Sequence, residues 1–310
     1  MTDYARTAAR PHHEHPAEGL TADLDQLRRL DRRRALGFLG LVSTSAFVTA
    51  CGGASGASTA TASTGSGATA TPTPTPTPTP TATATGGTGS STGNCVQYAT
   101  ETNGPYPADG TNRSNGSTSN VITQNGFVRS DIRSSVSTGN TAAGTELTLT
   151  VTLVDVNDDC AALEGYAIYV WHCDAEGDYS LYDLPAEDFL RGLQTTDANG
   201  QVTFTTIVPG TYNGRYPHIH FEVFSSITNA TTGRYAQLIS QFAVPKETLA
   251  SIYAQDTSYA ASVNALNATT LSSDNVFGDN SDEQIDAMTL AMSGSVAGGY
   301  TATATVGIAT

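Results

Sequence analysis

The sequence predicts an all-β fold, a β-sandwich with short helical excursions, on the basis of three observations. First, four segments alternate in period two and are rich in β-branched and aromatic residues: 146–156 (ELTLTVTLVDV), 166–173 (YAIYVWHC), 201–208 (QVTFTTIV) and 217–224 (PHIHFEVF). Second, Gly, Asn, Asp and Pro punctuate the gaps, with a hairpin-type turn at 197–201 (DANGQ). Third, helical patterns are confined to three short segments: 186–192, 245–254 and 281–292. Together these observations favour a sandwich.

Residues 1–50 have the features of a bacterial export signal. The apolar run ALGFLGLVSTSAFVTAC directly follows the arginines at 32–34, is too short to span a bilayer comfortably and ends in small residues. The long polar leader before paired arginines resembles a twin-arginine signal, and VTAC at 48–51 resembles a lipobox, whose cysteine is acylated. We therefore expect an exported lipoprotein, anchored through Cys51 to the outer face of the cell membrane. The alternative is an uncleaved anchor helix.

Residues 51–93 predict a tether behind this anchor. They consist almost wholly of Gly, Ala, Ser, Thr and Pro, including TPTPTPTPTP at 71–80, and offer no large apolar side chain for a core. The alternating prolines favour polyproline II, so a fully stretched tether would reach on the order of 100 Å. The remaining residues, 94–310, are enough for one all-β domain of ordinary size.

The charge balance excludes some partners. Residues 1–50 hold 7 of the 14 Lys and Arg and 6 of the 29 Asp and Glu, so the rest of the chain carries a formal charge of −16. Such an acidic surface argues against binding to nucleic acid and to acidic lipid. We expect contact with a membrane only through the anchor at Cys51. The oligomeric state is left open.

A pair of histidines in the last of the four strand segments points to a metal site. Successive side chains of a strand alternate faces, so His218 and His220 share one face, while Ile219 and Phe221 point to the apolar side. Two imidazoles side by side can hold a metal ion, although an isolated His-x-His is equally compatible with a cross-strand polar pair.

Two tyrosines complete a candidate ligand set. Tyr179 closes the segment WHCDAEGDYS, and Tyr212 precedes His218 by six residues. A phenolate is a hard anionic donor, and its pKa near ~10 is overcome far better by ferric iron than by zinc. Zinc more often recruits a cysteine or a third histidine, and Cys173 keeps that alternative open.

The motifs around these residues resemble the intradiol ring-cleavage dioxygenases, most closely their secreted branch. The resemblance covers roughly 94–245, and its motifs stand in family order: NCVQYATETNGPYPADG, RSDIR, VWHCDAEGDYS, FLRGLQTTDANGQVTFTTIVPGTYNGR, HIHF and LISQFAVP. It implies a non-haem Fe(III) bound by Tyr179, Tyr212, His218 and His220. By the family pattern Tyr212 and His218 are axial ligands, whereas Tyr179 and His220 are equatorial.

The resemblance also implies the reaction. A catechol-type diol and O2 are the substrates, and the ring is cleaved between its two hydroxyls to a muconate-type diacid. Tyr212 accepts a substrate proton, Arg215 stabilises negative charge on the ring, and Gln241 lines the substrate pocket. Tyr182 competes with Tyr179 for the ligand role, but Tyr179 occupies the Gly-x-Tyr position of the family motif. We expect His172, on the other face of its strand from Trp171, to be a structural or hydrogen-bonding residue.

Three cysteines remain after Cys51, and they allow three pairings in an exported protein. We expect a Cys95–Cys160 disulfide, because both residues lie in loops, and an unpaired, buried Cys173. Three other functions stay open at this point: an inactive, surface-displayed binding module of the same fold, a different metallo-oxygenase, and a zinc-dependent hydrolase using His218 and His220.

Overall fold

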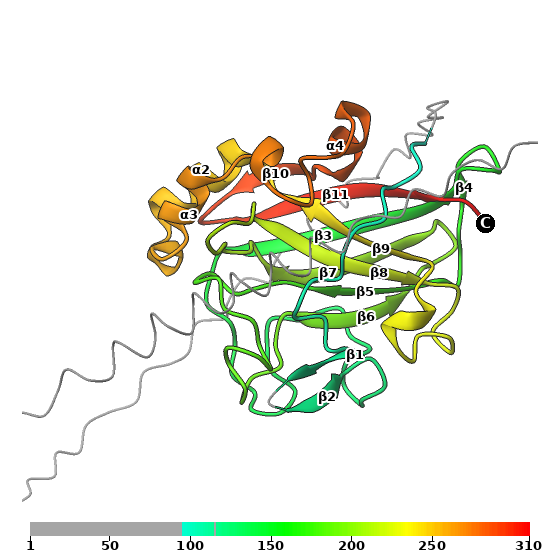
Figure 1. Cartoon of the computed structure of the whole chain (residues 1–310), viewed down its shortest axis with the longest axis horizontal. Coiled ribbons are helices and arrows are strands. Elements are labelled where there is room, and N and C mark those ends of the chain that lie inside the picture. The colour runs from blue at the N-terminus through cyan, green and yellow to red at the C-terminus, as the bar shows by residue number, and fades with distance from the viewer. Residues whose placement is uncertain (1–94, 115) are drawn as a thin grey trace, which may run out of the picture. The chain divides into compact units, whose positions relative to one another are not determined.

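Two β-sheets form the centre of the computed structural model (Figure 1). The structure describes residues 95–114 and 116–310, within a compact unit that spans Gly93–Thr310. The predicted export signal, the lipobox at Cys51 and the tether lie outside the described residues. Within the described part, no helix is long and apolar enough to cross a membrane.

The larger sheet has five strands. Its members are β10 (Ala291–Ser295), β11 (Gly299–Ile308), β3 (Glu146–Asp155), β4 (Ala161–Ala162) and β7 (Gln201–Ile207). The order is β10-β11-β3-β4, and β7 pairs with β3. The pairing of β11 with β3 is parallel and runs from Tyr300 opposite Leu147 to Ile308 opposite Asp155. The C-terminal strand therefore lies in the middle of the sheet, where it completes the sandwich.

The second sheet has four antiparallel strands and carries the candidate site. Its order is β6 (Arg191–Thr195), β5 (Ala167–Trp171), β8 (His218–Phe224) and β9 (Leu238–Ala243). Apolar side chains of β5, β8 and β9 join those of β3, β7 and β11 in one buried cluster between the sheets. These features confirm the predicted all-β sandwich.

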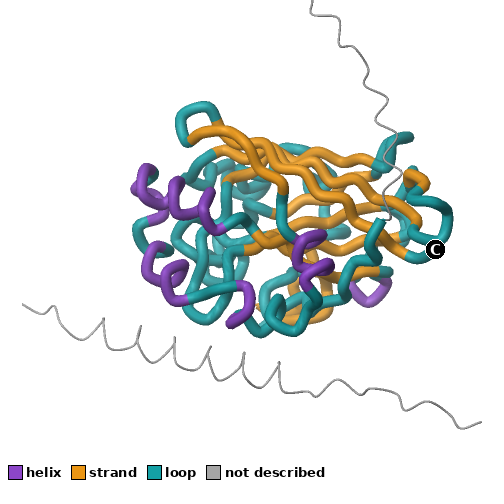
Figure 2. The backbone as a smooth tube through the Cα atoms, turned by 90° about the horizontal axis from the view of Figure 1, so that it is seen from above, coloured by secondary structure: helices purple, strands orange, loops and turns teal. Residues whose placement is uncertain are grey.

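Short elements surround the two sheets, and the helices lie at the periphery of the strands (Figure 2). They are β1 (Asp109–Ser114), β2 (Ser117–Asn120), η1 (Gly233–Tyr235), α2 (Lys246–Gln255), η2 (Thr257–Tyr259), α3 (Val263–Ala268), η3 (Leu271–Ser273) and α4 (Asp282–Met288). In α4 the predicted helix start takes the form of a capping box, in which Ser281 and Gln284 cap each other's backbone N–H.

Two local predictions are wrong. The segment 186–192 is not helical, because β6 begins at Arg191 and its buried guanidinium donates to the hydroxyl and carbonyl of Ser180. The turn at 197–201 forms, with the Asp197 N–H donating to the Gln201 carbonyl at 3.0 Å. However, it joins β6 of one sheet to β7 of the other, so it is a crossing between sheets and not a hairpin.

The disulfide prediction is confirmed. Cys95 and Cys160 are bonded across a sequence separation of 65, and Cys173 is free and buried. The bridge ties the start of the described chain to the turn between β3 and β4. In the loop-closure model, a cross-link over this separation stabilises the fold by about 4 kcal/mol.

Candidate metal centre

The two histidines lie on the outer face of the four-stranded sheet. His218 and His220 are each 2% exposed, while Ile219 and Phe221 between and after them enter the core, as the alternation predicts. The Nε2 atoms of the two histidines lie 3.0 Å apart. Both imidazoles thus present a ring nitrogen to the same point.

A hydrogen bond fixes the tautomer of His218. Its Nδ1 lies 2.5 Å from the carbonyl oxygen of Tyr216. Because a carbonyl can only accept, Nδ1 carries the proton and Nε2 is unprotonated, so Nε2 is the acceptor in the contact with His220. Burial, followed by the nearby charge of Arg215, lowers the pKa of His218 to about 3. The neutral imidazole is the form that binds a metal ion.

His220 is held by packing. Its ring stacks on Trp171 of β5 at a centroid distance of 4.8 Å and an angle of 4°, and its Nδ1 has no hydrogen-bond partner. Burial, followed by the proximity of His218, lowers the pKa of His220 well below its ordinary value. The second imidazole is therefore also neutral.

Two tyrosine rings close the group. Tyr179 contacts the ring of Tyr212 at 5.9 Å and that of His220 at 6.4 Å, and Tyr212 contacts the ring of His218 at 6.1 Å, all between centroids. With the two histidine rings 4.6 Å apart, each of the four rings touches two others. The structure thus brings together all four residues that the sequence singled out as metal ligands.

Tyr179 is unusual among buried tyrosines. Its side chain is fully buried, and its hydroxyl makes no well-formed hydrogen bond, although the hydroxyl of Tyr212 lies beside it. Burial, followed by the charge of Tyr212, raises the pKa of Tyr179 well above its ordinary value. Buried hydroxyls normally have a partner. A cation at this position would supply one, because it binds the phenolate.

A glycine allows the two tyrosine loops to meet. Tyr179 follows β5 after a short loop, and Tyr212 lies in the loop before β8. Gly177 in the first loop has φ +95°, and a Cβ at this position would lie 2.6 Å from the carbonyl oxygen of Thr211. Only glycine accommodates both the backbone conformation and this contact.

Tyr182 lies in a different environment. Its hydroxyl donates to Oδ1 of Asn112 at 2.7 Å and accepts from the N–H of Ala108 at 2.9 Å. The guanidinium of Arg191 lies 5.5 Å from the centre of its ring. The hydrogen-bonding capacity of Tyr182 is thus used by neighbouring protein groups, in contrast to that of Tyr179.

Arg215 and Gln241 are joined beside the four rings. Nη2 of Arg215 donates to Oε1 of Gln241 at 2.6 Å, and Nε2 of Gln241 donates to the carbonyl of Thr102 at 3.0 Å. Gln241 lies directly opposite His220 in the pairing of β8 with β9. Both side chains are almost completely buried.

Asp274 is a member of the site that the sequence did not reveal. Its Oδ2 accepts from Nε of Arg215 at 3.0 Å and from the N–H of Tyr216 at 2.6 Å. Burial is the largest influence on the pKa of Asp274 and would raise it, but the charge of Arg215, the N–H of Tyr216 and the nearby His218 together outweigh burial and lower that pKa. Asp274 follows η3, in a region without a recognisable motif, so only its position in space identifies it.

His172 and Cys173 do not belong to the ring group. His172 bonds to Oγ1 of Thr206 on the facing sheet and to the carbonyl of Cys173, both at 2.7 Å, and burial lowers its pKa to about 4. The thiol of Cys173 donates to the carbonyl of Gly210 at 3.4 Å. Across residues 95–114 and 116–310, no three His, Cys, Asp or Glu side chains gather as a metal site. A zinc site with Cys173 as third ligand therefore has no structural support.

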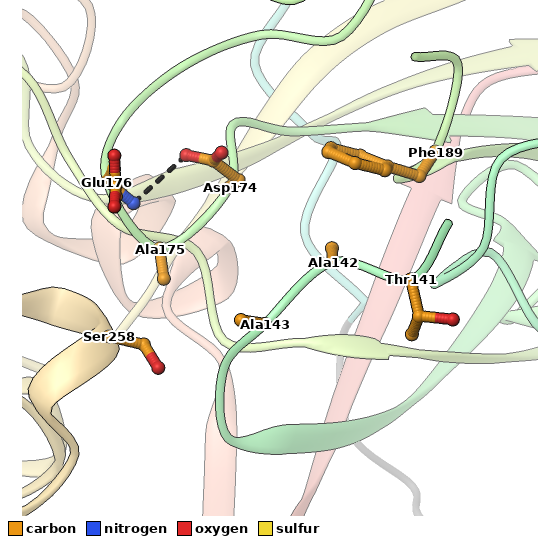
Figure 3. A pocket seen from close by; sticks show the side chains of 8 residues that line it. All are labelled: Thr141, Ala142, Ala143, Asp174, Ala175, Glu176, Phe189 and Ser258. Carbon is orange, nitrogen blue, oxygen red and sulfur yellow. Dashed lines mark hydrogen bonds between the residues drawn. The ribbon is translucent and has the colours of Figure 1, made fainter. Parts of the chain in front are cut away.

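A cavity of about 250 Å³ is lined in part by the loop before Tyr179 (Figure 3). It is lined by Thr141, Ala142, Ala143, Asp174, Ala175, Glu176, Phe189 and Ser258. In Figure 3 the N–H of Glu176 donates to the carboxylate of Asp174, at 2.9 Å. None of the six predicted site residues lines this cavity.

The fold and the ring group define a β-sandwich with a candidate metal centre on the outer face of one sheet, and comparison with known proteins agrees with this class. The family model described as "Dioxygenase" matches residues 118–242. Over this segment the chain is similar to that family of dioxygenases, which agrees with the resemblance that its sequence motifs show. No match is found among curated proteins.

Two solved structures illustrate the likeness. An intradiol ring-cleavage dioxygenase from Tetranychus urticae is 23% identical, with a TM-score of 0.53, and the match covers 69% of this chain and 95% of that one. A second crystal structure, of a dioxygenase, is 25% identical, with a TM-score of 0.52 and the same coverage of each chain. Both support the sandwich fold.

Proposed function

We propose that the protein is an Fe(III)-dependent dioxygenase that cleaves the ring of a catechol-type aromatic between its two hydroxyls, using O2, to give a muconate-type diacid. Tyr179, Tyr212, His218 and His220 would hold the iron. The observation that carries the proposal is the closed group of these four rings, in which the hydroxyl of a fully buried tyrosine makes no well-formed hydrogen bond.

The donor set fits ferric iron. Two neutral imidazoles and two phenols that ionise on binding neutralise much of a trivalent charge, and a hard cation prefers phenolate oxygen. The unprotonated Nε2 of His218 and the buried hydroxyl of Tyr179 are the groups that such an ion would use. When bound, the ferric ion would lower the pKa of the substrate hydroxyls and give the ring the electronic character that O2 requires.

The protein's own groups have separate tasks. Tyr212 is only partly buried, unlike Tyr179, and we assign it the role of accepting a substrate proton. Arg215 would stabilise negative charge on the bound ring, in a site shielded from water. Gln241 and Asp274 hold its guanidinium from two sides, which fixes the direction of that charge.

The substrate assignment rests on the family and on relatives described as intradiol ring-cleavage dioxygenases. A vicinal diol suits the centre because its two oxygens can chelate one ion. Catechol, hydroxyquinol and protocatechuate are the three diols to compare.

The direct test is the metal content and visible spectrum of the full chain. We expect one iron per chain and a tyrosinate-to-iron charge-transfer band. Tyr179→Phe should lower the iron content and bleach the band. Tyr182→Phe is the matched control, because it removes a hydroxyl whose partners are protein groups, and it should keep both. A colourless, iron-free protein that folds and binds a ligand would support the binding-module alternative, and stoichiometric zinc would support the hydrolase.

We also propose that the protein is exported and lipid-anchored at Cys51, on the strength of the arginines at 32–34, the short apolar run and the lipobox. Cys51→Ala should release the protein from the membrane fraction of the cells that express it. A variant that stays in the membrane fraction would indicate the uncleaved helix instead.

A further inference from the structure

Acidic side chains adjoin the group of four rings at two places. The carboxylate of Asp183 accepts the N–H of Tyr179 at 3.1 Å. Glu101 and Asp274 lie near Arg215: burial is the main influence on the pKa of each, and the charge of Arg215 acts on both. An additional anionic group on a ligand at this centre would therefore meet like charges.

Arg215 is the cation beside the four rings, and its charge is already matched. Its Nε donates to Oδ2 of Asp274 at 3.0 Å, and its Nη2 donates to Oε1 of Gln241 at 2.6 Å. The side chains of the ion pair are 5% and 0% exposed. The pair as a whole is neutral, so it stabilises charge on the reacting part of the ring but supplies no full positive charge for a second anionic group.

The other cations of the domain are engaged elsewhere. The Lys and Arg residues that follow residue 50 begin at Arg113, so the predicted tether contains none. Besides Arg215, four of them donate to backbone carbonyls, one pairs with two carboxylates and one is exposed on η1: Arg113, Arg129, Arg191 and Lys246, then Arg133, then Arg234. Among the described residues, this leaves Arg215, in its pair with Asp274, as the cation of the centre.

The segment that lies against the rings is uncharged. Residues 102–107 read TNGPYP. The ring of Tyr106 lies 4.7 Å from that of Tyr179 between centroids, and a Cβ at Gly104 would lie 3.2 Å from Cε1 of His220. Such surroundings suit a ring whose other substituents are hydrogen, alkyl or hydroxyl groups.

We propose that the substrate is an uncharged catechol, such as catechol, hydroxyquinol or an alkylcatechol, and that the centre discriminates against diols whose ring bears a carboxylate. The inference rests on the proposed dioxygenase function and narrows its substrate class. A ring carboxylate would add a negative charge next to Asp183 and Glu101 without a cation to pair with it. A desolvated charge without a partner, close to like charges, binds poorly.

The test is a titration of the iron-loaded full chain without O2, in which the visible band reports the binding of catechol, protocatechuate and 3,4-dihydroxybenzamide. The amide has nearly the shape of protocatechuate but no charge on its substituent. We expect catechol and the amide to bind on the order of 10²-fold more tightly than protocatechuate. With O2, kcat/KM for catechol should exceed that for protocatechuate in the same direction.

A charge variant tests the cause. At pH 8, above the pKa of about 7 of Glu101, Glu101→Gln removes a carboxylate and should strengthen the binding of protocatechuate by about three- to tenfold, with little effect on catechol. Glu283→Gln, at an exposed position of α4, is the matched control and should change neither.

Three results would overturn the inference while catechol is still cleaved. Protocatechuate that binds as tightly as catechol would show that charge is not selected. An amide as weak as protocatechuate would show that size decides. Equal effects of Glu101→Gln and Glu283→Gln would remove the electrostatic explanation. In contrast, an iron-loaded chain that neither binds nor consumes any diol would contradict the proposed dioxygenase function itself.

Discussion

At the scale of single residues, Asp274 determines how Arg215 is presented to the four-ring group. It reaches Arg215 across a sequence separation of 59, and the same carboxylate oxygen also accepts from the backbone of Tyr216. The side chains of the pair are 5% and 0% exposed. A buried, hydrogen-bonded ion pair of this kind fixes geometry, and removing one partner leaves the other charge uncompensated.

We expect Asp274→Asn to lower turnover while the iron content and visible band stay close to those of the wild type. The amide can no longer neutralise Arg215, so the guanidinium loses its orientation toward the substrate ring. Removing a charge stabiliser outright typically costs ~10²–10³ in rate, and mispositioning Arg215 should cost less. Steady-state kinetics on catechol would measure the effect.

The control for this experiment is Asp279→Asn, at an exposed position in the same segment. Equal losses of turnover in the two variants would mean that Asp274 supports the segment and not Arg215. A complete loss of iron in Asp274→Asn would place it in the metal centre itself.

The ligand set shows what could be predicted at the residue scale. His218, His220, Tyr179 and Tyr212 follow from strand parity, phenolate chemistry and motif order, because each is encoded within a short stretch of sequence. Asp274 could not be found in this way, since no local pattern marks an aspartate whose partners, such as Arg215, are distant in the sequence. The same holds for Glu222, which looks like an outward-facing strand residue in sequence and is fully buried in the fold.

At the scale of elements, the contact between the two tyrosine loops depends on Gly177. Its positive φ and the 2.6 Å approach of the Thr211 carbonyl leave no room for a side chain. We expect Gly177→Ala to push the loops apart and destabilise the protein, by about 1–3 kcal/mol for the backbone strain alone. Denaturant unfolding and iron content would both report the change.

The variant Gly165→Ala separates the effect of backbone strain from the effect of the contact between the two tyrosine loops. Gly165 also has a positive φ, +82°, but a Cβ there would meet no atom within 4 Å. It should therefore lose stability without losing iron. Equal iron loss in the two variants would show that the loop contact is unimportant for the centre.

The four predicted strands are present, and two of the three predicted helices, 245–254 and 281–292, correspond to α2 and α4. The four period-two segments match β3, β5, β7 and β8 to within two residues, because burial on one face imposes the alternation. The helix prediction for 186–192 is wrong because tertiary contacts of Arg191 override the local helical pattern. The strand β11, the parallel partner of β3, was not predicted, since no motif marks the region after about residue 250.

At the scale of the whole molecule, Glu101 links the start of the described chain to its C-terminal region. Its Oε1 accepts from Nδ2 of Asn280 at 2.9 Å, and its N–H donates to the carbonyl of Ile239 in β9 at 2.7 Å. Burial is the main reason that its pKa rises from 4.5 to about 7. The folded protein thus binds the Glu101 proton more tightly than the unfolded chain does.

This difference predicts a pH dependence of stability. The contribution of protonated Glu101 is fully present below pH 4.5 and is lost as the pH rises through about 7, because the folded-state pKa is the higher one. Glu101→Gln should therefore show a smaller fall in melting temperature between pH 4.5 and pH 7 than the wild type does. If the melting temperatures of the two proteins fall equally between pH 4.5 and pH 7, Glu101 does not cause the pH dependence.

The central claim is the position at which the ring is opened. The iron-loaded full chain, supplied with catechol under ¹⁸O₂, should consume the diol and release a muconate-type diacid that carries both labelled oxygen atoms, as mass spectrometry would show. A product opened beside the hydroxyls, or a fully iron-loaded chain that consumes none of the three diols, would contradict the proposed intradiol activity.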